Sequence, residues 1–418
     1  MTRPLRFCHL TTFFPPLNFG GDGIIVYRLS QELAARGHHV EVVHDADAYS
    51  LIAAGRPTPT GYPAPPGVQV HTLGGFPIVG PLVTHQLGVP GLKARRIRGI
   101  LEAGRFDVVH FHNVSLLGGP RLLTYGPRDA VRLYSLHDHW LVCPLHVLWK
   151  FDREPCVEKA CVRCQLAAGR PPQLWRRTPL LRRSLGSIDV FLAPSESTRA
   201  RHLQELDIPI RVLPLSVGPE ECDDYVPFAR ERPFFLFVGR LERLKGAHTL
   251  LPAFRRFPDA DLVVIGDGAY ARELRRQAEG MTNVQFFGWR PEREVRGARR
   301  AALAVLVPSV TTETFGLVAV EAWAHGKPVI AHAMGALPEL VEQSEGGLLY
   351  RNEEELLHAL RRVHSDGELR RRLGTNGHRA WLERWTTAVF ADNYLALIDE
   401  VAQAKRQAQP SRAVAGTL

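Results

Sequence analysis

The chain has 418 residues, of which 45% are hydrophobic and 23% charged; this is an ordinary soluble composition, and at about 150 residues per domain the length predicts two or three domains. No apolar run approaches the roughly 20 residues that span a bilayer, and Met1–Leu10 contains no signal-peptide core, so we expect a cytoplasmic protein. The net charge is +9, but the basic residues are spread without interleaved aromatics, and we therefore expect no nucleic-acid partner.

The first elements along the chain predict a βαβ unit. Leu5–Leu10 is a strand, Gly20 and Gly21 precede a helix over Ile24–Arg36, and a second strand follows at His38–Val43. Glycines between a strand and a helix let the backbone approach a ligand closely, although the same glycines also suit a tight turn. Both interpretations stay open at this point.

The next segments carry weaker signals. Asp45 and Asp47 imitate a metal-binding carboxylate pair but have no supporting partner, so we interpret them as an ordinary strand end. We expect a long loop over Ala46–Pro66. The apolar residues of Gly74–Gly91 show little helical spacing, so we expect a buried loop there, with an acceptor site or a membrane-touching patch as the alternatives. Leu92–Ala103 has the pattern of a basic amphipathic helix, whose charged face is either solvated or in contact with an anionic membrane.

A candidate catalytic histidine follows the strand expected at Ala130–Leu136. Ligands of open α/β sheets bind beyond the carboxyl ends of the strands, so we expect His137 to point into a ligand site. Asp138 would then hold the imidazole of His137 and set its tautomer. The alternative is a core histidine that backbone groups satisfy.

Four cysteines lie close together in an expected insertion over about residues 141–172. Cys161 and Cys164 have the two-residue separation that lets two thiolates hold one tetrahedral ion, and Cys143 and Cys156 could complete the ligand set. Disulfides are disfavoured in a cytosolic protein. The sequence therefore predicts either a structural zinc site or four reduced thiols without a metal.

After a polar linker, expected over residues 217–232, the strand pattern starts again. Phe234–Val238 is an apolar strand that Gly239 ends, and two cations come next, Arg240 and Lys245. Two fixed cations beyond a strand end can neutralise the charge of a phosphate-bearing ligand. A surface salt bridge is the alternative.

A further strand, loop and helix follow downstream. The apolar run Ala301–Val307 predicts a buried strand, and the polar residues after it predict a loop. Phe315–His325 has helical spacing, which would place the backbone N–H groups of Phe315, Gly316 and Leu317 at a helix N-terminus. The helix dipole there favours an anion such as a diphosphate.

Two glutamates flank this helix start. Glu313 and Glu321, with Phe315-Gly316-Leu317 between them and Gly326-Lys327-Pro328-Val329 after them, resemble the signature of retaining family-4 glycosyltransferases of the GT-B fold. The resemblance implies an enzyme that moves a sugar from a nucleotide-diphosphate sugar to an acceptor hydroxyl of a glycan, lipid or small molecule. It also implies retained anomeric configuration and no catalytic metal.

The resemblance implies an α/β fold of two doubly wound Rossmann-like domains that face each other across a cleft. We expect an N-terminal acceptor-side domain (1–216), the linker (217–232), a C-terminal nucleotide-sugar-binding domain (233–385), a helix that crosses back to the first domain (386–407) and a disordered tail (408–418).

The resemblance assigns roles to the candidate residues. Arg240 and Lys245 would grip the diphosphate, Glu313 would orient the sugar, Glu321 would bind the ribose and His137 would contact the sugar from across the cleft. The remaining candidates for substrate contacts are Gly20, Gly21, Gly239, Phe315, Gly316 and Leu317.

Two alternative functions stay open. A nucleotide-sugar epimerase or a phosphorylase shares the fold. A non-catalytic sugar-nucleotide-binding scaffold would instead use the basic helix and the cysteine segment as its working parts.

Overall fold

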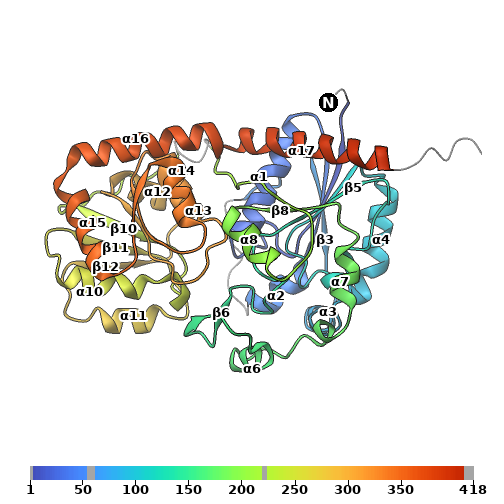
Figure 1. Cartoon of the computed structure of the whole chain (residues 1–418), viewed down its shortest axis with the longest axis horizontal. Coiled ribbons are helices and arrows are strands. Elements are labelled where there is room, and N and C mark those ends of the chain that lie inside the picture. The colour runs from blue at the N-terminus through green and yellow to red at the C-terminus, as the bar shows by residue number, and fades with distance from the viewer. Residues whose placement is uncertain (1–2, 54–61, 219–223, 409–418) are drawn as a thin grey trace, which may run out of the picture.

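The computed structural model describes residues 3–53, 62–218 and 224–408, which form two parallel sheets with helices against both (Figure 1). The N-terminal sheet has seven strands in the order β3-β2-β1-β4-β5-β8-β9. Every neighbouring pair in it is parallel. The strands are β1 (Arg6–Leu10), β2 (His39–Asp45), β3 (Val68–Leu73), β4 (Val108–Phe111), β5 (Val131–Ser135), β8 (Val190–Ala193) and β9 (Ile210–Val212).

The C-terminal sheet has six parallel strands in the order β12-β11-β10-β13-β14-β15. Its apolar strands are buried on both faces: Phe234 and Leu236 pack into one hydrophobic cluster, while Phe235 and Phe237 pack into another on the opposite face. The strands are β10 (Phe234–Val238), β11 (Asp261–Ile265), β12 (Val284–Gly288), β13 (Val305–Val307), β14 (Val329–His332) and β15 (Gly347–Tyr350).

Helices connect the strands within each sheet. In the N-terminal part they are α1 (Gly21–Ala35), α2 (Ala46–Ala53), α3 (Val79–Leu87), α4 (Ala94–Ala103), α5 (Gly119–Leu122), α6 (Cys161–Ala167), α7 (Leu180–Leu185) and α8 (Glu196–Leu203). In the C-terminal part they are α10 (Leu250–Arg255), α11 (Ala271–Gln277), α12 (Glu292–Ala301), α13 (Leu317–Ala324), α14 (Leu337–Ser344), α15 (Glu353–Ser365) and α16 (Gly367–Arg384). Short 3-10 turns are η1 (Gly91–Lys93), η2 (Leu174–Arg177), η3 (Arg243–Lys245) and η4 (Ala247–Thr249).

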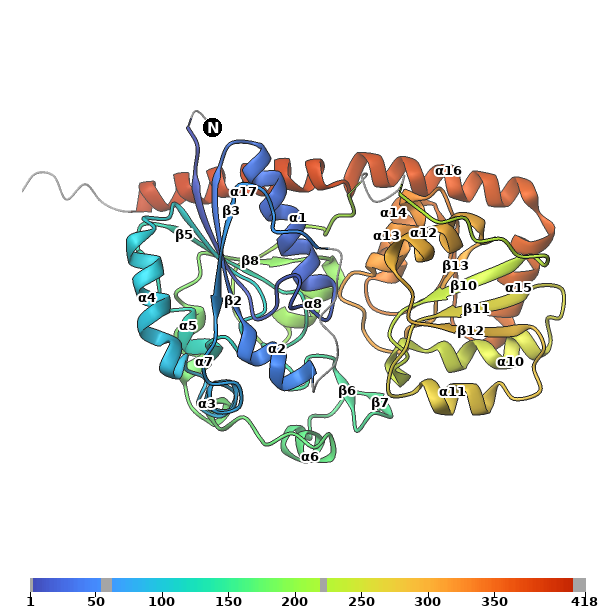
Figure 2. The ribbon, with the colours of Figure 1, turned by 180° about the vertical axis from the view of Figure 1, so that it is seen from behind.

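The last helix, α17 (Thr387–Ala408), returns to the N-terminal sheet (Figures 1 and 2). Phe390 and Tyr394 of α17 pack into the same hydrophobic cluster as Phe7 of β1. Near the end of the helix, Lys405 forms an ion pair with Asp189 at 2.8 Å. This is the crossing helix that the sequence predicts.

Two expected loops contain helices. The segment Ala46–Pro66 begins with α2, and Gly74–Gly91 contains α3. Helix α3 buries Gly80, Pro81 and Thr84 and leaves its large apolar side chains exposed. The helical spacing of apolar residues that marks a core-facing helix is therefore missing from α3, and the expectation of a buried loop is wrong.

Smaller differences concern element boundaries. The apolar run expected as a strand from Ala301 begins as the end of α12, and β13 spans only its last three residues. The predicted tail and linker fall partly on residues 409–418 and 219–223, which lie outside the described residues. None of the helices in the described ranges combines the length and apolar character that crossing a membrane requires.

Candidate active site between the two sheets

The loop between β13 and α13 forms the centre of the site. Gly316 is the N-cap residue of α13 and has a φ of 102°, in the left-handed region that favours glycine. A Cβ at Gly316 would lie 2.7 Å from Leu337 Cδ2, and the neighbouring Phe315 is buried in the core. The helix therefore starts at Leu317, two residues later than predicted, and its first N–H groups have no partner within the helix.

Glu313 and Lys245 meet in this loop, although they are 68 positions apart. Lys245 Nζ donates to Glu313 Oε1 at 2.6 Å, and Ser309 Oγ donates to the same oxygen at 2.6 Å. Burial alone would raise the pKa of Glu313, but the charge and hydrogen bond of Lys245, with the hydrogen bond of Ser309, hold it below the ordinary value. Glu313 is therefore an ionised carboxylate next to the start of α13.

Close backbone packing brings Lys245 to Glu313. Gly246, which follows Lys245, has a φ of 74°, and a Cβ on it would lie 1.8 Å from the carbonyl oxygen of Pro308. Val310 N also donates to Leu244 O at 3.0 Å. The turn after β10 thus lies directly against the loop after β13.

Arg240 also follows β10 but takes a different position. Its Nη1 donates to Glu242 Oε1 at 2.8 Å, and 61% of its side chain is exposed. The charge of Arg240 still contributes, as the smallest of the named causes, to the lowered pKa of Glu313. Gly239 N donates to Ile265 O at 3.1 Å, so Gly239 ties the end of β10 to β11.

Glu321 is held by a buried arginine that the sequence analysis missed. Arg299 Nη2, on α12, lies 2.5 Å from Glu321 Oε2, and its Nη1 lies 2.8 Å from Glu292 Oε1. Only 3% of the Arg299 side chain is exposed. The sequence offers little signal for this contact, because Arg299 is one of several arginines in α12.

The start of α1 faces the start of α13. A Cβ at Gly21, the first residue of α1, would lie 2.7 Å from Leu317 Cδ1. Gly20 is the N-cap of the same helix. The structure therefore brings the predicted glycines of the N-terminal sheet against the predicted helix start of the C-terminal sheet.

His137 lies beyond β5, as predicted, but its partner is different. His137 Nε2 lies 2.9 Å from His112 Nδ1. Asp138 Oδ2 instead accepts from His146 Nδ1 at 2.7 Å, and Asp138 Oδ1 accepts from Trp140 N at 2.8 Å. The prediction that Asp138 holds the imidazole of His137 is wrong, because the backbone turns after His137 and directs the Asp138 carboxylate toward the following loop.

Hydrogen bonds join the loops after β5 and β8 to the Glu313 loop. Thr314 Oγ1 donates to the carbonyl oxygen of His137 at 3.0 Å. Ser195 Oγ and Thr198 Oγ1, at the start of α8, donate to Thr314 O at 2.7 and 2.9 Å. Glu339 accepts from Glu196 N and Ser197 N, both at 3.1 Å. The loop that carries His137 is therefore in contact with the loop that carries Glu313 and leads into α13.

The Asp45 and Asp47 carboxylates form a structural ion cluster. Lys93 Nζ lies 2.5 Å from Asp45 Oδ2 and 3.4 Å from Asp47 Oδ2, and all three side chains are buried. Asp45 is the last residue of β2, as expected, but the expectation of no supporting partner is wrong, since Lys93 ties β2 and α2 to the turn before α4.

The four cysteines surround the small hairpin of β6 (Trp149–Lys150) and β7 (Glu154–Pro155) and the start of α6. All four are free thiols, and Phe151 N donates to Cys164 Sγ at 3.4 Å. Among the described residues, the only group of three ligand atoms within 4.8 Å of one another is His9, His110 and His112. No three of these sulfurs are that close, whereas Zn–S bonds of about 2.3 Å would place them about 3.8 Å apart. The four sulfurs as arranged here do not fit a bound zinc ion. Zinc binding stays a prediction from the sequence.

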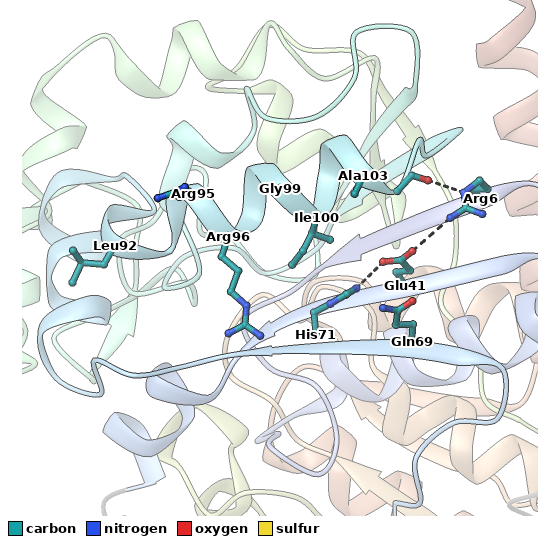
Figure 3. A pocket seen from close by; sticks show the side chains of 11 residues that line it. Arg6, Glu41, Gln69, His71, Leu92, Arg95, Arg96, Gly99, Ile100 and Ala103 are labelled. Atoms are coloured by element: carbon teal, nitrogen blue, oxygen red, sulfur yellow. Dashed lines mark hydrogen bonds and ion pairs between the residues drawn. The ribbon is translucent and has the colours of Figure 1, made fainter.

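A cavity of about 770 Å³ lies elsewhere, between α4 and the strands β1 to β3 (Figure 3). Glu41 lines it, accepts a hydrogen bond from His71 at 2.6 Å and pairs with Arg6 at 3.7 Å. Arg95 and Arg96 of α4 also line it. None of the predicted site residues lines this cavity.

Two family models match consecutive parts of the chain. One, described as Glycosyltransferase Family 4, matches residues 19–221, and the other, described as Glycosyl transferases group 1, matches residues 222–380. Two solved structures share the fold across nearly the whole chain. Sucrose-phosphate synthase from Thermosynechococcus elongatus has a TM-score of 0.69 and 21% identity, covering 96% of this chain and 100% of that chain. Anabaena HepE in complex with UDP and glucose has a TM-score of 0.65 and 18% identity, covering 94% and 99%.

Curated relatives are also glycosyltransferases. The D-inositol 3-phosphate glycosyltransferase of Stackebrandtia nassauensis is 28% identical over 95% of this chain and 90% of that protein. The lipopolysaccharide core biosynthesis glycosyltransferase LpsE of Rhizobium meliloti is 30% identical over 40% of this chain and 50% of that protein. A D-inositol 3-phosphate glycosyltransferase of Corynebacterium jeikeium is 36% identical over 39% and 37%. The chain thus spans half or less of the length of two of these relatives.

The fold and the matches define the class of protein, a glycosyltransferase with the GT-B fold. Within that class, the two models together cover residues 19–380, and the chain belongs to the family-4 type of GT-B glycosyltransferases. The predicted family and fold class are therefore confirmed. The roles of the individual site residues stay predictions.

Proposed function

We propose that this glycosyltransferase moves a sugar from a nucleotide-diphosphate sugar to an acceptor hydroxyl, in the cytoplasm, with retained anomeric configuration and without a catalytic metal. The observation that carries the proposal is the Lys245–Glu313 pair at the start of α13, opposite the start of α1. Anabaena HepE, which shares the fold, was solved with UDP and with UDP-glucose. These complexes support a nucleotide-sugar donor.

The diphosphate would bind between Lys245, Arg240 and the first amides of α13. Negative charge grows on the diphosphate as the sugar leaves, and fixed positive charges and N–H dipoles stabilise that charge in a site that excludes water. Lys245 is held at 2.6 Å from Glu313, so its ammonium group is oriented before the donor binds. Arg240 is exposed and can swing from Glu242 to the diphosphate.

Bond changes on one face of the sugar would give retention. The bond between C1 and the diphosphate oxygen breaks, and its electron pair moves to the diphosphate. The acceptor oxygen forms the new bond to C1 on the same face, and its proton passes to a diphosphate oxygen. Glu313 would orient the sugar, His137 would contact it from the other sheet, and Glu321, held by Arg299, would bind the ribose.

The acceptor is proposed to reach the site from the N-terminal sheet, with peripheral contact to a membrane. Helix α3 exposes the apolar side chains of Val79 and Leu82, and its N-cap residue Ile78 is exposed as well. The next α-helix, α4, exposes Arg95 and Arg96. An apolar surface beside arginines is suited to an anionic bilayer.

A panel of nucleotide-diphosphate sugars, assayed for release of the nucleotide diphosphate in the presence of candidate acceptors, tests the proposed function. We expect release that depends on an acceptor, and a product whose anomeric configuration by NMR equals that of the donor. Inversion would contradict retention, and an epimerised donor in the absence of acceptor would favour an epimerase. Binding of a nucleotide diphosphate by calorimetry, without any release from a donor in the presence of acceptors, would favour a non-catalytic scaffold, and absence of binding would contradict the proposal.

A further inference from the structure

Four histidines gather under the site at the carboxyl ends of β1, β4 and β5. His137 Nε2 lies 2.9 Å from His112 Nδ1, and His112 Nε2 lies 3.0 Å from His9 Nδ1. His9 and His112 are buried, and so is His110, whose ring centroid lies 3.9 Å from that of His112. The rings of His137, His112 and His9 therefore form a head-to-tail chain that leads from the site into the core.

The same group has the spacing of a metal site, but its nitrogen atoms already have partners. His110 Nδ1 lies 2.9 Å from Tyr394 Oη, and His110 Nε2 lies 2.9 Å from Ser135 Oγ. His112 uses both ring nitrogens in the chain. Only His9 Nε2 is buried without a hydrogen-bond partner, and one nitrogen does not make a metal site. The group is therefore a hydrogen-bond network.

Each ring of the chain carries one N–H at neutral pH. Burial lowers the pKa of His9 to about 3 and that of His112 well below its usual range. Burial also lowers the pKa of His137, against the opposing effect of Asp22 and Asp138. Because a neutral imidazole has one donor and one acceptor, a chain of three such rings has only two possible proton orders.

The two proton orders differ at the ends of the chain. In the first, His137 Nε2 donates to His112, His112 Nε2 donates to His9, and His9 Nε2–H is left buried without an acceptor. In the second, His9 Nδ1 donates to His112, His112 Nδ1 donates to His137, and His137 carries its proton on Nδ1 at the site.

One physical argument favours the second order. A buried N–H without an acceptor is a rare and costly arrangement in proteins. The second order avoids it, because it places the proton of His9 on Nδ1 and leaves the buried Nε2 without one.

We propose that His9 and His112 are positioning residues that fix His137 as the Nδ1–H tautomer, so that His137 donates a hydrogen bond to an oxygen of the bound sugar. This inference rests on the proposed function for the identity of that oxygen. The tautomer itself depends only on the histidine chain. A sugar oxygen that becomes more negative in the transition state would bind an N–H more strongly, and a bare ring nitrogen would repel it.

Nitrogen-15 NMR of the histidine rings in the full-length protein tests the tautomers without any substrate. We expect His9, His112 and His137 all to carry the proton on Nδ1 at pH 7.5, and the spectrum to stay unchanged on addition of zinc. An Nε2–H tautomer at His137, a doubly protonated His112, or rings that shift with zinc would each overturn the proposal. Because donor binding is not involved, this result is separate from the test of the proposed function.

Substitution of His112 tests the consequence for catalysis. Asn places its amide N–H near the position of Nδ1, whereas Gln places it near Nε2 and away from His137. We expect H112Q to lower kcat/KM by about tenfold, the effect of one lost hydrogen bond, and H112N to recover most of the activity. Both variants should bind the free nucleotide diphosphate like the parent.

The matched control is Y394F, which removes the partner of His110 and leaves the chain from His9 to His137 intact. We expect Y394F to keep the tautomers and most of the activity. Equal losses in H112N and H112Q, with parental thermal unfolding, would overturn the role of the Nδ1 proton. If instead no variant and no parent binds a nucleotide diphosphate, the proposed function fails while the NMR result still decides the tautomer.

Discussion

At the scale of single residues, the site depends on the ion pair between Lys245 and Glu313. Lys245 is partly exposed, with 28% of its side chain accessible, and Glu313 with 15%. An ammonium group that already has a carboxylate partner is fixed in place, but that partner offsets part of the effect of its charge. Arg240 is not paired with Glu313; its partner is Glu242, and 61% of its side chain is exposed. We therefore expect the two cations to contribute differently to catalysis.

The first prediction concerns these two cations. K245A should lower kcat/KM by about 100-fold or more, because one fixed donor to a developing oxyanion contributes roughly that much. R240A should lower it less, since the guanidinium of Arg240 is exposed and pairs with Glu242. Steady-state kinetics with the preferred donor measures both effects.

The control for this prediction is R243A, which removes an exposed arginine from the same η3 turn. We expect parental kinetics for R243A. K245A also leaves the buried Glu313 carboxylate without its cation, so thermal unfolding must show that the variant is folded. Unchanged turnover in both K245A and R240A would refute the assigned roles.

At the scale of elements, the structure places the N-termini of α1 and α13 against each other. Each helix begins at glycine: Gly21 is the first residue of α1, and Gly316 is the N-cap of α13. A side chain at Gly21 would displace the end of the Leu317 side chain. A side chain at Gly316 would instead meet Leu337 of α14.

The second prediction follows for G316A. The φ of 102° and the 2.7 Å approach to Leu337 Cδ2 mean that a methyl group there strains the backbone and the core, at a cost of about 1–3 kcal/mol. Binding of UDP or another accepted nucleotide diphosphate should weaken as well. Calorimetry and denaturant unfolding measure the two effects.

The control for G316A is G99A in α4. A Cβ at Gly99 meets nothing within 4 Å, and Gly99 has no positive φ. Since alanine is the better helix former, G99A should stabilise the protein slightly and leave binding unchanged. Equal affinity in G316A and the parent would show that the helix start is not part of the donor site.

The third prediction concerns the cysteine segment, which lies beside the site: Thr311 Oγ1, in the Glu313 loop, donates to Val147 O at 2.7 Å. We expect protein purified without added metal to contain about one zinc per chain, held by Cys143, Cys156, Cys161 and Cys164. Zinc binding would require the four sulfurs to move closer together than in the described structure.

Metal analysis of the parent and of C161S tests this. C161S should lose the zinc, whereas C222S should keep it, since Cys222 is remote in sequence and lies outside the described residues. Less than one zinc per several chains of the parent would rule the site out, and the segment would then hold four reduced thiols.

At the scale of the whole molecule, two sheets are held together by loops and by one returning helix. Helix α17 packs on the N-terminal sheet, while the loops after β5 and β8 bond to the Glu313 loop. Helix α4 lies on the side of the N-terminal sheet that faces away from the C-terminal sheet, and α3 lies below the N-terminal sheet in this view (Figure 2). A surface there could contact a membrane without blocking the site.

The fourth prediction tests that surface. The parent should co-sediment with vesicles that contain phosphatidylglycerol and not with vesicles of phosphatidylcholine alone, because arginines next to apolar side chains favour an anionic bilayer. The double variant I78D/V79D should lose binding, since these side chains are 60% and 57% exposed. R95E/R96E should lose it too.

The control is W289D, which changes an apolar residue that is 70% exposed in the C-terminal part. We expect W289D to bind vesicles like the parent. Absence of vesicle binding by the parent would remove the membrane from the proposal and leave a soluble acceptor.

The sequence by itself determined the fold class and the central segment of the site. Apolar runs such as Phe234–Val238 are buried on both faces of a sheet whatever surrounds them, and the order of residues from Glu313 to Glu321 places the helix start within two positions. Both signals are local, because burial and helix spacing depend on neighbouring residues. Helix α3 was missed for the same reason, since its exposed apolar side chains carry no local sign of a helix.

Only the tertiary structure decided which of these groups touch. Three contacts join residues from different parts of the chain. Lys245 contacts Glu313, Arg299 forms an ion pair with Glu321, and His137 contacts His112. Such contacts depend on the packing of whole elements, and no short-range pattern encodes them. The partner assigned to His137 was wrong on that account: Asp138 is adjacent in sequence, but the chain turns, and the residue that follows β4, His112, is the partner instead.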